Sequence, residues 1–366
     1  MRWLLMPVFC LMVATAQSPA DGRMYWGDKV PPTIPYQRSL ILFKDGIETL
    51  ILQSRYQLPE SKSAVSMGWV VPVPAVPEVA SLRADSASRM FHELSNITYP
   101  RVTRVSNLIF IFVFFGFGGL LLLTLLVCMV SLPGFLPACI RRNRERLVCY
   151  SLGGVTICLY MALIFNALGY AGRSSGVDVI AEHRVGIYDV TVLRSDKADE
   201  LIDWLNDNAF HYGPEDRAVI ESYLSNKWCF VVAHIRPEVK PYDRTTQDDG
   251  LVAPLILRFP HVKPVYPLML TGTGGHETEI LIYILANSEM TTDERLSLRY
   301  SGEGDVAELA RLSLDVEPAG FFKSDDWYFY HLCKFRDVLS PTDMVRDISF
   351  NPVSDSASFR EHLIRW

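Results

Sequence analysis

The residues best suited to chemistry lie in a glycine-rich segment, Thr271-Gly272-Thr273-Gly274-Gly275-His276. Glycine-rich loops bind phosphate when they lead into a helix whose amides face the anion, usually with a lysine and a hydroxyl at its start. Here the residues that follow, Glu277 to Ala286, have the apolar pattern of a strand and include no lysine. The segment therefore fits a turn between strands better than a phosphate-binding loop.

Two histidine–carboxylate pairs could supply metal ligands, His276 with Glu279 and His92 with Glu93. A protein metal site needs at least three ligands in most cases, and neither pair has an adjacent third. We expect no metal and no other cofactor.

An enzyme would have to assemble its site from scattered side chains. Serine nucleophiles lack a strand–elbow–helix setting. A hydrolase could still use His183, Asp189 and His276 if these converged in a concave pocket. We keep this hydrolase as the alternative to the leading hypothesis, a membrane-tethered extracytoplasmic binding or assembly module that is not an enzyme and whose ligand is unknown. A transmembrane signal sensor ranks third, because the expected cytoplasmic part is too short for an output domain.

Of seven cysteines, only Cys229 and Cys333 lie outside both the first 16 residues and the hairpin region, residues 107–170. In an oxidising compartment these two could form a disulfide. The alternative is that both are small buried apolar residues, since Cys229 belongs to the strand-like Trp228-Cys229-Phe230-Val231-Val232.

Two uncharged apolar stretches, 107–132 and 148–170, occupy the middle of the chain. Each is long enough to cross a hydrocarbon core of about 30 Å as a helix. They predict a transmembrane hairpin, so the polar segments 17–105 and 173–366 should share one compartment.

The linker 133–147 should be cytoplasmic. It contains four arginines and one acid, Glu145, as the positive-inside rule expects; the arginines are Arg141, Arg142, Arg144 and Arg146. Residues 1–16 read as a signal peptide, with Arg2, a short apolar run and the small residues Ala14-Thr15-Ala16. An uncleaved anchor is the alternative. The expected location is the cell membrane, multi-pass, with the main domain extracytoplasmic, or periplasmic.

Small residues in the two stretches would allow close helix contact within the membrane. They are Gly116, Gly118, Gly119, Gly153 and Gly154, together with the polar Asn166. The expected partners are the lipid bilayer and another membrane protein bound through the hairpin. A net charge of −6 argues against nucleic acid.

The polar segments carry clear local signals. Residues 39–56 predict a hairpin turning at Asp45-Gly46, and Met67 to Pro74 predicts a strand whose prolines belong at a sheet edge. Helices are predicted over 83–94, from Ser195 or Asp196 to about Asn208, from Pro214 to Leu224, and over 303–312. Further strands are predicted at 177–181, 188–193, 228–235, 251–259 and 279–286.

Because strands come in runs with interspersed helices, the expected fold class is α+β. We expect a mixed or largely antiparallel sheet with packed helices, interrupted by the two-helix transmembrane hairpin. The two polar segments should form one domain, with two separate domains as the alternative.

Several of these segments resemble, in order, an uncharacterised bacterial family of exported proteins, domain of unknown function 2330. The likeness rests on the Asp45-Gly46 hairpin, Gly68-Trp69-Val70-Val71-Pro72-Val73-Pro74, Gly186-Ile187-Tyr188-Asp189-Val190, the helix with Leu201, Trp204, Leu205 and Asn208, and Trp228 to Val232. The resemblance implies an exported, membrane-attached bacterial protein and supplies no catalytic residues. This sequence departs from the family pattern in its middle, where two apolar stretches replace a low-complexity segment.

Overall fold

A computed structural model describes residues 23–26, 33–57, 67–104, 176–210, 212–236, 251–303, 314–323, 331–354 and 357–365. Its central hairpin joins β2 (Thr33–Lys44) to β3 (Ile47–Gln57). Asp45 and Gly46 form the turn with φ values of 52° and 74°. Two successive positive φ angles match the twist of the flanking strands, which is why Asp-Gly occurs there. The predicted hairpin is confirmed.

The smaller sheet has five antiparallel strands in the order β1-β4-β9-β8-β7. Their bounds are Arg23–Trp26 for β1, Met67–Val73 for β4, Cys229–Ile235 for β9, Tyr188–Ser195 for β8 and Val177–Val185 for β7. The strand β1 pairs with β4 only as far as Val70. Pro72 therefore lies beyond that pairing, where its missing N–H removes no bond to β1.

The larger sheet has nine strands in the order β15-β5-β10-β3-β2-β12-β16-β14-β19. Besides β2 and β3, the bounds are Val316–Glu317 for β15, Glu78–Leu82 for β5, Leu255–Pro260 for β10, Thr278–Ala286 for β12, His331–Leu339 for β16, Ser297–Gly302 for β14 and Phe359–Arg360 for β19. The pair of β2 and β12 is parallel, and the other described pairs are antiparallel. Each sheet therefore combines strands from both sides of residues 105–175.

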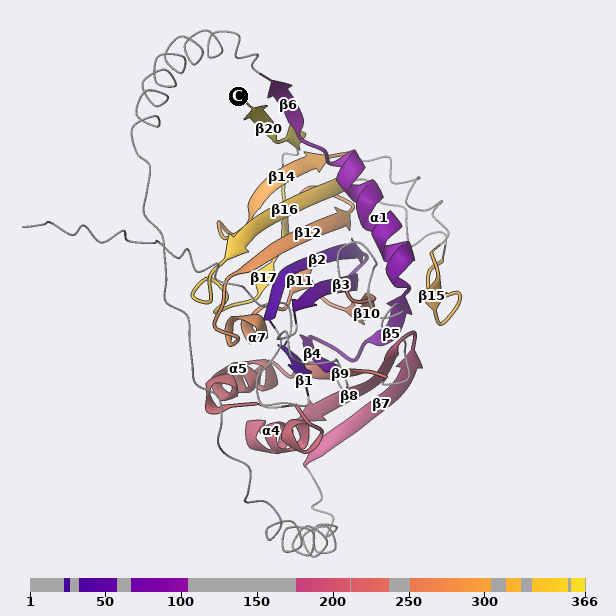
Figure 1. Cartoon of the computed structure of the whole chain (residues 1–366), viewed down its shortest axis with the longest axis vertical. Helices are drawn as coiled ribbons and strands as arrows, with labels where there is room; N and C mark the ends of the chain where they lie inside the picture. The colour runs from indigo at the N-terminus through magenta and orange to yellow at the C-terminus, as the bar shows by residue number, and fades with distance from the viewer. Residues whose placement is uncertain are drawn as a thin grey trace, which may run out of the picture. The chain divides into compact units, whose positions relative to one another are not determined.

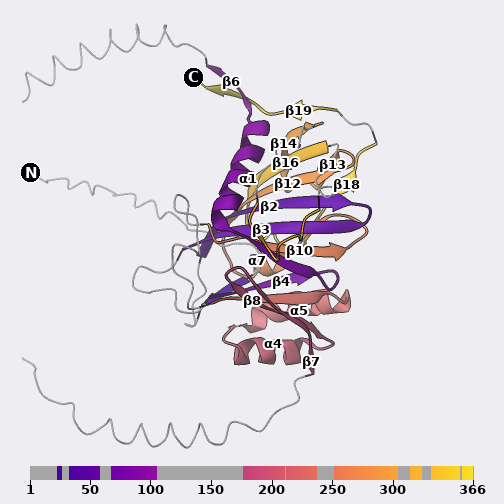
Figure 2. The same ribbon diagram turned by 90° about the vertical axis from the view of Figure 1, so that its right-hand side faces the viewer.

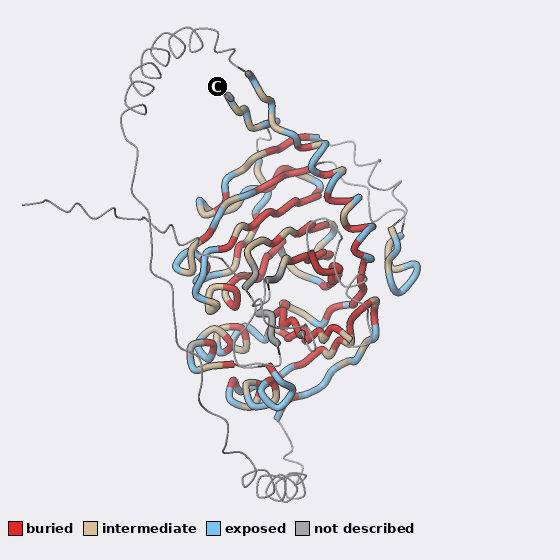
Figure 3. Tube along the Cα trace, in the orientation of Figure 1, coloured by how far each residue is buried: buried red, intermediate tan, exposed pale blue. Residues whose placement is uncertain are grey.

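The two sheets pack face to face around the main core. One continuous cluster of buried side chains joins Trp69, Val71 and Val231 of the smaller sheet to Leu50 and Ile282 of the larger sheet. Figure 3 shows this buried interior between the exposed outer surfaces. Both faces of β2 are covered, since Ile41 belongs to this cluster while Leu40 and Leu42 belong to another. The nearly continuous apolar run of the hairpin reflects this burial on both sides.

Helices cover the two outer faces. α1 (Ala84–Ile97) packs Met90, Phe91 and Leu94 against the larger sheet, on the face that we call the helix-side face (Figure 2). α4 (Ala198–Asp207) and α5 (Pro214–Ser225) pack on the outer face of the smaller sheet (Figure 1). Pro214 begins α5, as predicted, because the first helical position needs no N–H donor. The helix predicted at 303–312 falls almost wholly outside the described residues.

The expected α+β class is wrong, because the described residues are mostly strand: 49% strand and 18% helix. The sequence suggested one sheet with helices, whereas two sheets stack on each other and each carries helices only on its outer face. The error came from the segment after residue 286, where short strands alternate apolar and charged residues and resemble loops.

The described helices also bear on the expected membrane location. The longest is α1 with 14 residues, about 21 Å at 1.5 Å per residue, which is short of a hydrocarbon core. No helix in the described part of the chain is long and apolar enough to span a membrane. This finding contradicts the expected multi-pass membrane location. The stretches 107–132 and 148–170 themselves lie outside the described residues, as do the predicted signal peptide 1–16 and the linker 133–147.

The chain divides into two compact units, residues 1–101 with 175–362, and residues 102–174 with 363–366. Both sheets belong to the first unit. Short pairs complete its loops: β11 (Val265–Tyr266) with β17 (Ile348–Ser349), and β13 (Met290–Thr291) with β18 (Asn351–Pro352). The described residues of the second unit fall in the paired strands β6 (Arg101–Arg104) and β20 (His362–Arg365).

Candidate functional site

Strand register gathers basic and aromatic side chains on the helix-side face. Tyr36 of β2 lies opposite Arg55 of β3 and, on its other side, opposite Glu279 of β12. Arg38 follows Tyr36 by two residues and therefore points to the same face. Arg336 of β16 lies beside Glu279. We call Tyr36, Arg38 and Arg55 the arginine–tyrosine cluster.

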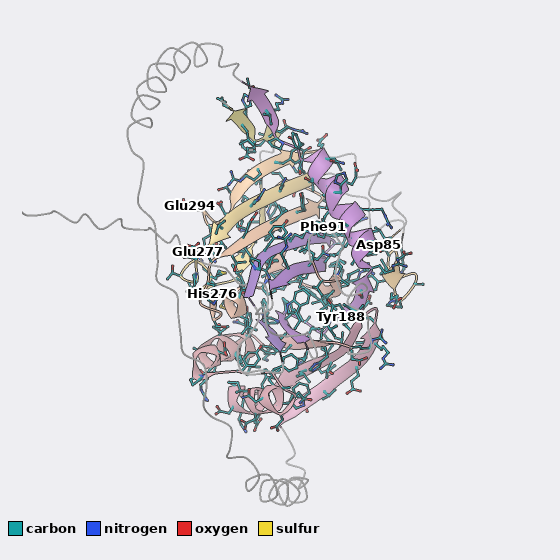
Figure 4. All side chains as sticks on the ribbon, in the orientation of Figure 1. Asp85, Phe91, Tyr188, His276, Glu277 and Glu294 are labelled. Carbon is teal, nitrogen blue, oxygen red and sulfur yellow. The ribbon has the colours of Figure 1, made fainter. Side chains whose placement is uncertain are left out.

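Arg38 is held in place by two neutral groups. Its Nε donates a hydrogen bond to Oε1 of Gln53 at 2.8 Å, and the Gln53 amide in turn donates to the carbonyl oxygen of Val252 at 2.8 Å. The guanidinium carbon lies 4.3 Å from the centroid of the Phe91 ring, a cation–π distance. Phe91 projects from α1 toward the sheet in Figure 4. Arg38 is therefore fixed from both the sheet and the helix.

Arg55 has an unfilled donor position. Its guanidinium carbon lies 6.0 Å from the centroid of the Tyr36 ring. Its Nε is buried and has no hydrogen-bond acceptor among the residues that the structure describes. A buried charged donor without an acceptor lowers the free energy of unfolding by about 1–3 kcal/mol. An acceptor from a bound molecule would remove that cost.

The Tyr36 side chain is a hydrogen-bond donor at physiological pH. Burial raises the pKa of its hydroxyl, Arg38 opposes the shift, and Glu279 adds to it. The hydroxyl therefore stays protonated well above neutral pH. Tyr36 lies directly opposite Arg55 in the strand register, and Arg38 occupies the diagonal position on β2.

One ion pair borders the cluster. Arg336 donates from Nε to Oε1 of Glu279 at 2.6 Å. The Glu279 carboxylate is therefore already paired with Arg336. The neighbouring Tyr36, Arg38 and Arg55 carry a net positive charge. Paired guanidinium groups with a neutral hydroxyl match the geometry of a carboxylate or a phosphate, which accept several N–H and O–H bonds at once.

The glycine-rich segment does not offer amides to a ligand. The N–H groups of Thr271, Gly272, Gly274 and Gly275 all donate to carbonyl oxygens within the segment or just before it. They form α7 (Met269–Gly272) and the turn after it, in which Gly275 has a φ of 78°. The interpretation as a phosphate-binding loop has no support here, because its donors are already used.

The histidine–carboxylate pairs do not gather a third ligand. Glu279 bonds Arg336, and His92 and Glu93 lie on the outward part of α1. Among the described residues, no group of three His, Cys, Asp or Glu side chains is placed to share a metal ion.

The three residues of the alternative hydrolase lie apart. His183 and Asp189 belong to the β7–β8 hairpin of the smaller sheet, and Asp189 accepts a hydrogen bond from Nε of Arg184 at 2.9 Å. His276 precedes β12 in the larger sheet. Figure 4 shows His276 well separated from Tyr188, the neighbour of Asp189. The structure therefore does not bring these residues into one site.

A different serine–histidine pair escaped the sequence analysis. Oγ of Ser301 in β14 lies 2.7 Å from Nε2 of His331 in β16, and Sγ of Cys333 lies 3.9 Å from the same Oγ. Burial lowers the pKa of His331, against the opposing charges of Glu289 and Glu303. All three members are buried, so a substrate has no access to the serine. Because Ser301 and His331 are distant in sequence, no local motif indicates that they form a pair.

The two cysteines are free and buried. Cys229 lies in β9 of the smaller sheet and Cys333 in β16 of the larger sheet. Burial raises the pKa of the Cys333 thiol to about 11. These observations favour the alternative that both are core residues over a disulfide.

The remaining predicted residues cannot be placed. The helix-contact set Gly116, Gly118, Gly119, Gly153, Gly154 and Asn166 lies outside the described residues, as does the topology set Arg141, Arg142, Arg144 and Arg146. Conversely, the sequence analysis passed over Tyr36, Arg38 and Arg55. The available signal was a polar or aromatic residue at alternate positions of strands that are otherwise apolar.

Comparison with curated proteins finds no match. Among solved structures, baculovirus P35 is similar at 9% identity with a TM-score of 0.35, covering 88% of this chain and 98% of that one. A mutated baculovirus P35 after caspase cleavage gives 9% identity, a TM-score of 0.34, and 86% and 99% coverage. Scores this low carry no argument about fold or function.

The family comparison is decisive. The model of DUF2330, described as an uncharacterized protein conserved in bacteria, matches residues 33–319. The match covers strands of both stacked sheets, though not β1, β16 or β19, and includes Tyr36, Arg38, Arg55 and Glu279. It confirms the resemblance noted from the sequence motifs. The chain belongs to the DUF2330 family of uncharacterised bacterial proteins.

Proposed function

We propose that this protein is a binding or assembly module that recognises an oxyanion group of its ligand, a carboxylate or a phosphate, at the arginine–tyrosine cluster. The observation that carries the proposal is the buried Nε of Arg55, a charged donor for which the described part of the chain offers no acceptor. On the adjacent strand, Tyr36 lies opposite Arg55 and Arg38 occupies the diagonal position.

The cluster is suited to binding because its members are preorganised. Gln53 and Phe91 hold Arg38, and Tyr36 stacks near Arg55, so little side-chain freedom remains to be lost. The Glu279–Arg336 pair closes one side of the cluster. A ligand oxyanion would exchange its water for two guanidinium groups and one hydroxyl.

Calorimetric titration of the purified full chain tests the proposal, with inorganic phosphate and citrate as separate probes. The variant Arg55→Gln should weaken binding about 10- to 100-fold, because a hydrogen bond to a charged group contributes about 1.5–3 kcal/mol and 1.4 kcal/mol is tenfold. Raised salt should weaken wild-type binding as well.

The matched control is Arg217→Gln. Arg217 is an exposed arginine of α5 that pairs with Asp199 and Glu221. The Arg217→Gln variant should bind phosphate and citrate with the affinity of the wild type. Equal affinity for wild type and Arg55→Gln, or equal losses in both variants, would refute the proposed site. Preference for phosphate or for citrate then distinguishes the two oxyanion classes.

A further inference from the structure

The core between the two sheets contains a group of polar side chains at one end of β2. Gln37, Ser39, Ser54 and Thr278 have no exposed surface. Each of them points to the same side of the larger sheet as residues of the main core in its own strand, namely Ile41, Leu52 and Ile280. We call these four polar residues the interior polar patch.

Strand register brings the interior polar patch together around Gln37. Ser54 of β3 lies directly opposite Gln37, and Ser39 is the next core-facing residue along β2. On the other side of β2, Gln37 lies opposite Ile280 of β12, so Thr278 is the core-facing residue diagonal to Gln37. Opposite residues have Cβ atoms about 5 Å apart, and diagonal residues are about 7–8 Å apart. A small molecule can therefore contact two members of the patch at once.

Each member has a polar atom without a hydrogen-bond partner in the described part of the chain. These atoms are Nε2 of Gln37, Oγ of Ser39, Oγ of Ser54 and Oγ1 of Thr278. The Gln37 amide is held from its other end, because the Tyr266 hydroxyl donates to Oε1 of Gln37 at 3.2 Å. Buried polar atoms are almost always hydrogen-bonded, and each one left unpartnered destabilises the fold. Four such atoms in one patch indicate a bound partner.

The chemistry of the interior polar patch selects an uncharged and very small partner. Its three hydroxyl groups can each donate or accept, and the Gln37 amide donates. A buried ion would find no counter-charge among these side chains. In the strand register Ser39 lies between Leu52 and Ile282, whose side chains are each two heavy atoms larger than that of serine. Water fits, because it adds one heavy atom, donates and accepts, and when buried makes about three hydrogen bonds.

We propose that the interior polar patch is a binding site for internal water that bridges β2 to β3 and β12. Ser54 and Thr278 lie on the two strands that flank β2, which are about 9–10 Å apart. One water molecule with two hydrogen bonds of about 3 Å spans less than this distance. At least two water molecules therefore take part, one on each side of Gln37.

The water site is independent of the oxyanion site. Gln37 and Ser39 alternate with Tyr36 and Arg38 along β2, so the interior polar patch and the arginine–tyrosine cluster lie on opposite faces of the larger sheet. The two proposals can therefore fail separately.

The variant Thr278→Val tests the water site, because valine has the shape of threonine without its hydroxyl. Oxygen-17 relaxation dispersion of the solvent detects internal water that exchanges slowly, and its amplitude grows with the number of such molecules. We expect a smaller amplitude for Thr278→Val than for the wild-type chain. In urea unfolding, the folding equilibrium constant should fall about three- to tenfold, because a hydrogen bond to bound water is lost.

The matched control is Thr98→Val, at a buried threonine whose Oγ1 donates to the carbonyl oxygen of Leu94 at 2.7 Å. This control should also lose stability but keep the wild-type dispersion amplitude. Ser54→Ala provides a second comparison and should lower the folding equilibrium constant as well. A dispersion amplitude unchanged by Thr278→Val, or a gain of stability in Thr278→Val and Ser54→Ala, would overturn the proposal, since removing a hydroxyl that truly lacks a partner stabilises a protein.

Discussion

Glu48 provides the sharpest test of the packing between the two sheets. It lies in β3 with no exposed surface. Its Oε2 accepts a hydrogen bond from the amide of Val265 at 3.0 Å, and its Oε1 is buried without a partner. Burial raises the pKa of this carboxyl well above its usual range, although the Val265 bond opposes the shift. Glu48 is therefore protonated in the folded protein under conditions that ionise it in the unfolded chain.

The sign of the effect follows from proton counting. An unfolded glutamate releases its proton above about pH 4.3. Between that value and the folded-state pKa, the folded protein binds one proton more than the unfolded chain, so stability falls by about 1.4 kcal/mol for each pH unit. The contribution of Glu48 is fully present below the unfolded pKa and is lost as pH rises toward the folded pKa. Glu48→Gln removes the titration and keeps an oxygen to accept from Val265.

Urea unfolding at pH 5, 6 and 7 measures this difference directly. The free energy of unfolding of Glu48→Gln should rise relative to wild type by about 1.4 kcal/mol per pH unit within the window between the two pKa values. Comparing the two proteins cancels the contributions of groups far from Glu48. Glu182→Gln, at an exposed position of β7, is the control and should follow wild type. A difference between wild type and Glu48→Gln that does not change with pH would refute the burial of an unionised carboxyl.

Two further predictions concern the core. In Gly68→Ala the new Cβ would lie 2.3 Å from Cε1 of Phe210, so urea unfolding should show a loss of about 1–3 kcal/mol, partly recovered by adding Phe210→Leu; an unchanged midpoint would contradict the contact. Cys229 and Cys333 should react with a thiol reagent only after unfolding, because both are buried free thiols. A peptide pair linked through Cys229 and Cys333 in a non-reducing mass map would show instead that the two residues form a disulfide.

Local signals explain which elements the sequence predicted correctly. The Asp45-Gly46 turn requires positive φ angles that these residues tolerate, and Pro214 begins a helix where an N–H is not needed. Met90, Phe91 and Leu94 repeat at helical spacing because α1 buries one face. Each of these features depends on residues within one or two turns of chain.

The fold class depended on weaker signals. β14 and β16 interrupt their apolar residues with cations, as Lys334 and Arg336 flank Phe335, so neither strand shows a continuous apolar run. Such strands form because the cations pack against aromatic rings and carboxylates on the helix-side face. That environment exists only after the sheet has formed, and a single-sequence pattern therefore reads them as irregular.

The positions of the candidate site residues depend on the strand register, which the composition of β2 does not reveal. Tyr36 and Arg38 point to the helix-side face, while Gln37 and Ser39 between them point into the core with a side-chain nitrogen and hydroxyl that have no partners. Because polar residues occupy both faces of this half of β2, alternation alone does not choose between them. The antiparallel pairing with β3 and the parallel pairing with β12 make the choice, setting Arg55 on one side of Tyr36 and Glu279 on the other. A slip of β2 by one residue would exchange the two sets and bury the guanidinium group of Arg38 between the sheets, so the apolar core that fixes the register also creates the arginine–tyrosine cluster.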